Sequence, residues 1–86
     1  MTTLYGARTA ARLLVAQNPE LGQIAQAQWL ELHNQIEGIL MARRPKLKSW
    51  EIRHSIERAR ETFLDSLVAR DPKETRCAKT LARIGL

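Results

Sequence analysis

Hydrophobic residues recur at steps of three and four along two long segments of the chain. Such steps place the residues on one face of a helix, and no alternation typical of a strand competes with them. We therefore predict two long amphipathic helices. Their apolar stripes consist of Leu21, Ala25, Trp29, Leu32, Ile36 and Ile39 in the first helix, and of Ile52, Ile56, Ala59, Phe63 and Leu67 in the second.

Prolines and capping residues mark the ends of the predicted helices. Proline directly follows Asn18 and Asp71, which is typical of an N-cap residue followed by a first-turn proline. Glu74 stands three residues after Asp71, so its side chain would complete a capping box. The third proline, Pro45, interrupts the helical pattern, and Ser49 is the expected N-cap of the helix that follows.

These signals predict an all-α fold in a single domain over residues 1–86. The two long helices, at about residues 19–43 and 49–70, have similar lengths and a very short connection. Such a connection favours a long antiparallel helical hairpin, against which shorter helices at about residues 3–17 and 72–84 would pack. The expected architecture is a small four-helix bundle built on this hairpin.

The chain is short and basic. It has 86 residues, a formal net charge of +5 and one cysteine, Cys77. A lone cysteine gives no sign of an oxidising compartment, and the N-terminal stretch has arginines and no continuous apolar segment. We therefore expect a cytoplasmic protein that does not contact a membrane. A chain of this length has a thin core, which favours a homodimer or docking on a larger partner.

The positive charge is concentrated where the two long helices meet. Residues 43–60 contain seven basic and two acidic residues, a net +5, whereas residues 19–42 contain three acidic residues and no basic one. Cations just ahead of the unpaired N–H groups at a helix start are suited to binding phosphate. The alternative is an exposed turn whose cations keep the hairpin soluble, with Ser49 occupying those N–H groups. We call this cluster the cationic end; it consists of Arg43, Arg44, Lys46, Lys48, Trp50 and Arg53.

Trp50 lies off the apolar stripe of its helix. At 100° per residue it falls on the side of Glu57, Glu61 and Leu64. We favour the interpretation that Trp50 packs in the core or at the edge of the bundle, covering its end, and the same interpretation is favoured more strongly for Trp29. A tryptophan beside cations is also typical of residues that stack on a base or anchor a protein partner.

The last predicted helix carries basic residues along one face, opposite Cys77, Leu81 and Ile84. They are either a second, lesser contact for an acidic partner or simply the solvated face of the helix. These residues are Lys73, Arg76, Lys79 and Arg83.

Arg8 and Arg12 lie one turn apart in the first helix, and the first nineteen residues contain no acid. Such a pair repels slightly in an isolated helix. We favour pairing with Glu20, Glu31 or Glu37 of the next helix over a contact with a partner.

Leu30, Met41, Leu64 and Val68 are further apolar residues that fall outside the main stripes. Leu30 shares its side of the helix with polar residues, and Leu64 and Val68 lie on a secondary face. Together they suggest a second buried surface, used for a dimer or for docking, unless the first or last helix covers it.

Patterns typical of catalysis are missing from the sequence. His33, His54 and Cys77 have no metal-ligand spacing, and there is no glycine-rich phosphate loop. The turn before Gln26 and Gln28, either of which could read adenine, matches a helix-turn-helix only weakly. We therefore expect a non-enzyme with no cofactor, no metal site and no small-molecule substrate.

The expected function is binding. The charge favours nucleic acid, or a place in a nucleoprotein assembly, reached through the cationic end. The alternative is a regulator, an adaptor or inhibitor whose basic surface docks on an acidic protein. A purely structural dimeric bundle is a third interpretation.

Overall fold

The computed structural model describes residues 6–43 and 46–86, with side chains from residue 9 onward. This part of the chain forms helices and contains no strand, which confirms the all-helical prediction. The predicted start of the first helix at residue 3 lies outside the described residues. The helices are α1 (Gly6–Gln17), α2 (Pro19–Met41), α3 (Ser49–Val68) and α4 (Lys73–Arg83).

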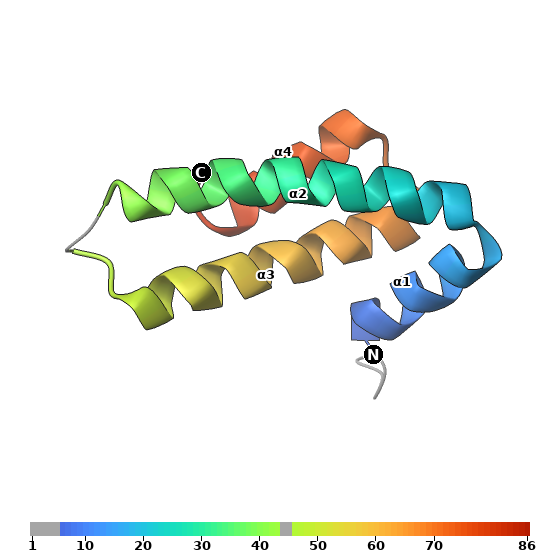
Figure 1. The fold of residues 1–86 in the computed structure, drawn as a ribbon, viewed down its shortest axis with the longest axis horizontal. Coiled ribbons are helices and arrows are strands. Elements are labelled where there is room, and N and C mark those ends of the chain that lie inside the picture. Colours follow the sequence, from blue (N-terminus) through green and yellow to red (C-terminus); the bar gives the residue numbers. More distant parts are fainter. Residues whose placement is uncertain (1–5, 44–45) are drawn as a thin grey trace.

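Helix α3 contacts all three of the other helices (Figure 1). α2 and α3 lie side by side and run in opposite directions along the longest axis of the molecule, which extends 42 Å. α1 contacts both long helices near one of their ends, and α4 lies behind α2 in this view and packs on α3. None of the described helices is long and apolar enough to cross a membrane.

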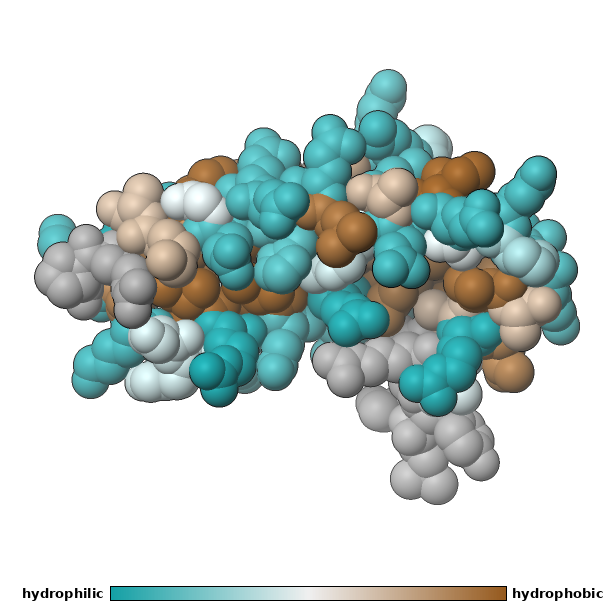
Figure 2. All heavy atoms as spheres, in the orientation of Figure 1, coloured by the Kyte–Doolittle hydropathy of each residue, from teal (hydrophilic) through white to brown (hydrophobic). Residues whose placement is uncertain are grey.

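The core forms along the predicted stripes except near the end of α2, where Leu40 is buried and the predicted Ile39 is only half-buried. Ile36, Ala59 and Phe63 are essentially inaccessible, and Trp29 and Leu21 pack partly buried against them. Hydrophilic side chains cover most of the face in Figure 2, and hydrophobic ones gather between α2 and α3. The buried cluster consists of Ala25, Leu32, Ile36, Leu40, Ile52, Ala59, Phe63 and Leu67.

The start of α3 differs from the prediction. Ser49 is the first helical residue, and the N-cap is Lys48, whose backbone is extended. The Lys48 N–H donates to Glu51 Oε1 over 3.1 Å. Glu51 therefore takes the position of the acid in a capping box, reaching back to the start of its own helix.

The predicted capping box at Asp71 is also wrong. Pro72 is the N-cap of α4, and its side chain offers no hydrogen bond. The Asp71 carboxylate instead accepts hydrogen bonds from Ser66 Oγ over 2.6 Å and Lys79 Nζ over 2.7 Å. Its oxygen thus binds groups on α3 and α4 rather than the orphan N–H groups of the helix start. Asn18 does precede α2, with Pro19 in the first turn, but its side chain makes no capping bond.

Candidate functional site

The cationic end lies where α2 stops and α3 begins, at one tip of the elongated molecule (Figure 1). Arg43, Lys46, Lys48 and Arg53 are all exposed there. None of these four side chains forms an ion pair within the described part of the chain. Arg44 belongs to the predicted cluster but lies outside the described residues. The tip therefore presents at least four unneutralised cations.

Trp50 is 64% exposed in the first turn of α3. The favoured interpretation, that it packs over the end of the bundle, is therefore wrong. Trp29 behaves as expected, because its ring stacks on His33 at 5.6 Å and lies against Phe63 at 5.5 Å. Exposing an indole ring to water is unfavourable, and Trp50 is exposed in this way next to the cations.

One acid lies within the cationic end. Glu51 is half-buried, and its carboxylate is turned back onto the Lys48 N–H. This hydrogen bond satisfies one of the N–H groups at the start of α3, so an anion would meet fewer free donors there than the sequence suggests. Attraction for an anion at this tip therefore comes mainly from the side-chain cations.

The basic residues of α4 do not share one exposed face. Arg76 is only 7% exposed, donates to Gln28 Oε1 over 3.0 Å and to the Asp71 carbonyl over 3.3 Å, and lies over the Phe63 ring. Lys79 is bound to the Asp71 carboxylate. Only Lys73 and Arg83 remain exposed and without an ion pair among the described residues. The expectation of a continuous cationic face is therefore wrong for Arg76.

Asp71 ties α4 to α3 through charge. Hydrogen bonds from Lys79 and then Ser66 hold the pKa of its carboxyl below the ordinary value of 3.8. Ser66 is buried and its hydroxyl donates to the same oxygen that Lys79 binds. The Asp71 carboxylate therefore makes contacts within the protein that stabilise the packing of α4 on α3.

The expected pairing of Arg12 with an acid of α2 does not form. Across residues 9–43 and 46–86 the ion pairs are His33 with Glu37, at 3.7 Å, and Lys79 with Asp71. Arg12 is exposed and lines a groove instead. The side chain of Arg8 lies outside the described part of the chain.

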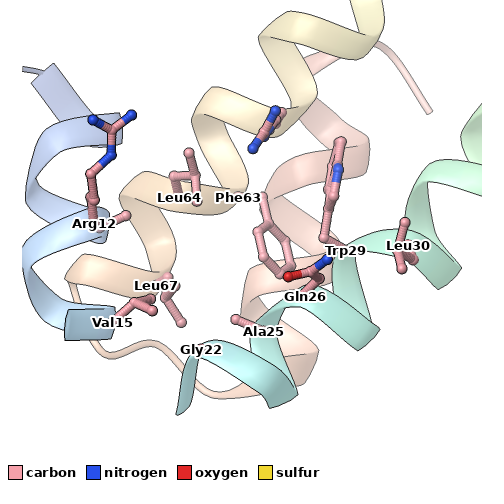
Figure 3. A pocket seen from close by; sticks show the side chains of 12 residues that line it. Arg12, Val15, Gly22, Ala25, Gln26, Trp29, Leu30, Phe63, Leu64 and Leu67 are labelled. Atoms are coloured by element: carbon pink, nitrogen blue, oxygen red, sulfur yellow. The ribbon is translucent and has the colours of Figure 1, made fainter. Parts of the chain in front are cut away.

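This groove was not anticipated from the sequence (Figure 3). It lies between α1, α2 and α3 and has a volume of about 590 Å³. Its floor is apolar, and Arg12, Gln26, Leu30 and Arg60 are its exposed members. The lining residues are Ala11, Arg12, Val15, Gly22, Ala25, Gln26, Trp29, Leu30, Arg60, Phe63, Leu64 and Leu67.

The described residues offer little to metal or acid–base chemistry. Among them, no three His, Cys, Asp or Glu side chains lie close enough together to hold a metal ion. His33 stacks on Trp29 and approaches Glu37, and Cys77 is half-buried against the core. Gln28, one of the glutamines considered for reading adenine, is occupied by Arg76.

The chain was also compared with known proteins. No family model, no curated protein and no solved structure matches it.

Proposed function

We propose that the protein binds single-stranded nucleic acid through the cationic end. The observation that carries this proposal is the exposure of Trp50 among cations that have no acidic partner in the described structure. Lys48 and Arg53 flank the indole in sequence, and Arg43 and Lys46 lie in the connection that precedes it. Phosphate contacts from such cations and stacking from an aromatic ring are the two parts of single-strand binding.

The arrangement suits a single strand better than a duplex. In a single strand the bases are accessible to a ring that projects from a helix end, whereas in a duplex they are stacked on one another. Because one aromatic residue provides one stacking position, we expect modest affinity that depends strongly on salt. The hairpin of α2 and α3 would act as the rigid support that holds the tip away from the rest of the bundle.

A second function is favoured by Met41, which is 46% exposed at the end of α2. Together with Trp50 it provides two exposed apolar side chains at the cationic tip. Tryptophan and methionine are enriched where proteins bind one another, so this tip would then dock on an acidic protein surface. The protein would in that case be an adaptor or inhibitor.

The proposal is tested by titrating the protein with fluorescent single-stranded and duplex oligonucleotides over a range of salt concentrations. We expect tighter binding to the single strand, with log K falling linearly as log salt rises. Trp50→Ala should cost about 1–3 kcal/mol of binding free energy if the ring stacks on a base. Leu13→Ala removes a side chain of similar exposure from α1 and should leave binding unchanged.

Two results would overturn the proposal. One is the absence of binding to any oligonucleotide at low salt. The other is equal affinity of the wild type and Trp50→Ala for the single strand, which would show that Trp50 does not stack on a base. Capture of an acidic protein that depends on Met41 and Trp50, without oligonucleotide binding, would support the adaptor instead.

A further inference from the structure

A second aromatic ring, that of His54, lies beside Trp50 at the start of α3. Both side chains are exposed, and they are four residues apart in the helix. Four residues correspond to about 6 Å along a helix and about 40° around it, so the two side chains are neighbours on one face. Helical side chains lean toward the N-terminus, which inclines His54 toward Trp50 and the tip. An indole and an imidazole are therefore exposed next to each other.

Neither ring has a partner within the described side chains, residues 9–43 and 46–86. In this part of the chain, Trp50 and His54 form no ring contact, side-chain hydrogen bond or ion pair. Trp29 and His33 of α2 have the same spacing, but their rings stack on each other and Trp29 lies against Phe63. The pair in α2 therefore serves the packing of the protein, whereas the pair in α3 leaves both rings accessible to a ligand.

Two adjacent exposed rings fit a single strand better than one ring does. Single-strand binders stack successive bases on successive aromatic side chains, and histidine is among the residues that stack on bases. On the basis of the proposed function, we infer that His54 stacks on the base next to the one that Trp50 binds, and that protonation of His54 strengthens binding. His54 is thereby a second base-binding residue of the cationic end.

The charged residues around His54 determine the direction in which the strand leaves it. Glu57 and Glu61 follow His54 on the same side of α3, and both are exposed. They repel phosphates, so the strand has to run from His54 toward the cations of the tip. The other charged neighbours are Arg58, one turn later, and Glu51, one turn earlier and bonded to the start of the helix. His54 lies on the side of α3 opposite its buried stripe, so no other helix packs on it.

A histidine in this position makes binding depend on pH. Histidine gains a positive charge as the pH falls from about 8 to about 5. The neutral ring stacks on a base, and the charged ring also attracts a phosphate. Each phosphate contact on a single strand contributes about 0.7 to the slope of log K against log salt. Acid should therefore tighten binding and make it more sensitive to salt.

The test is a titration with fluorescent oligothymidylate at about pH 8 and about pH 5, each over a range of salt concentrations. Thymine gains no proton in this range, so a change in affinity comes from the protein. The wild type should have a slope about 0.7 steeper at the lower pH. His54→Ala should bind at least about fivefold more weakly at the higher pH, the least that one stacked base contributes, and its slope should not change with pH.

Two further variants separate stacking from charge. His54→Phe keeps an aromatic ring without the titrating group, so it should bind as tightly as the wild type at the higher pH and show no change of slope with pH. His33→Gln is the matched control, because it removes the other histidine of the chain, which stacks on Trp29 in α2. It should keep the pH dependence of the wild type. Circular dichroism of each variant should show unchanged helicity.

The inference is overturned if His54→Ala binds as tightly as the wild type at the higher pH, or if His54→Phe binds as weakly as His54→Ala. It is also overturned if the slope still changes with pH in both His54 variants. Binding that Trp50→Ala weakens and His54→Ala does not would overturn this inference and leave the proposed function standing. Absence of oligothymidylate binding by the wild type would overturn both.

Discussion

Gly22 determines how closely α1 approaches α2. A Cβ atom at this position would lie 2.5 Å from Val15 Cγ1 and 3.4 Å from Val15 Cβ. Valine is branched at Cβ and has little rotamer freedom, so it cannot easily move aside. Gly38, in the same helix, has no atom within 4 Å of such a Cβ. Substitutions at these two glycines of α2 therefore distinguish the effect of packing from the effect of helix propensity.

We expect Gly38→Ala to raise the free energy of unfolding by about 0.5–1 kcal/mol, because alanine is the better helix former. Gly22→Ala gains the same propensity but forces α1 away from α2, so the free energy of unfolding should fall by about 1–3 kcal/mol. Urea unfolding followed by circular dichroism measures both changes. Equal stabilisation by the two substitutions would contradict the close packing of Val15 on Gly22.

The burial of Arg76 could not be predicted from its position in the helix. Its spacing from Lys73 and Lys79 predicts a cation on a solvated face, yet Arg76 is buried. The groups that hold it include Gln28, 48 positions earlier, and the ring of Phe63 on α3. These contacts depend on how α4 docks on the other helices, which periodicity within α4 does not specify. The same holds for Trp50, whose exposure depends on whether another element covers it.

At the scale of elements, the sequence predicts the helices well and their caps poorly. The apolar stripes and the prolines act locally, so the four helices could be located to within a few residues. Whether a side chain caps a helix depends on which of several possible hydrogen-bond partners it contacts in the folded protein. Asp71 binds Ser66 and Lys79, and the N-cap position falls to Pro72. The hydroxyl of Ser66 becomes a competitor only once α3 and α4 are packed together.

The contact between α3 and α4 should weaken in acid. Because Lys79 and Ser66 lower the pKa of Asp71, the unfolded chain binds a proton more readily than the folded one. The stabilisation is fully present above the ordinary value of 3.8 and is lost as the pH falls through the lower pKa of the folded state.

We therefore expect Asp71→Asn to be less stable than the wild type at neutral pH, and this difference should shrink below pH 3.8. Urea unfolding of both proteins over a series of pH values measures it. Ser66→Ala removes one of the two hydrogen bonds to the Asp71 carboxylate. The stability difference between wild type and Ser66→Ala should therefore also shrink in acid, but by less than the difference for Asp71→Asn. A difference between wild type and Asp71→Asn that does not change with pH would contradict the proposed role of the carboxylate.

For the whole molecule, the clustering of residues along the sequence predicts the cationic end but does not predict the groove. The cationic end could be located from the sequence because its residues are neighbours along the chain. The groove draws its lining from three helices, and Arg12 and Arg60 are far apart in sequence. Leu30 and Leu64 gave a partial signal, because each lies off its own stripe, and the structure brings both to the groove. Their meeting depends on the placement of α1 and on the register of α2 against α3.

Two variants of equal net charge test whether the cationic end binds nucleic acid. Lys46→Gln/Lys48→Gln removes two cations from the tip, and Lys73→Gln/Arg83→Gln removes the two exposed, unpaired cations of α4. The measurement is the slope of log K against log salt for binding to a single-stranded oligonucleotide. We predict that the first variant lowers the slope by about 1.4, since each phosphate contact on a single strand contributes about 0.7, and that the second leaves it unchanged. If the tip variant leaves the slope unchanged, or if the α4 variant lowers the slope as much, the cationic end is not the main contact with nucleic acid.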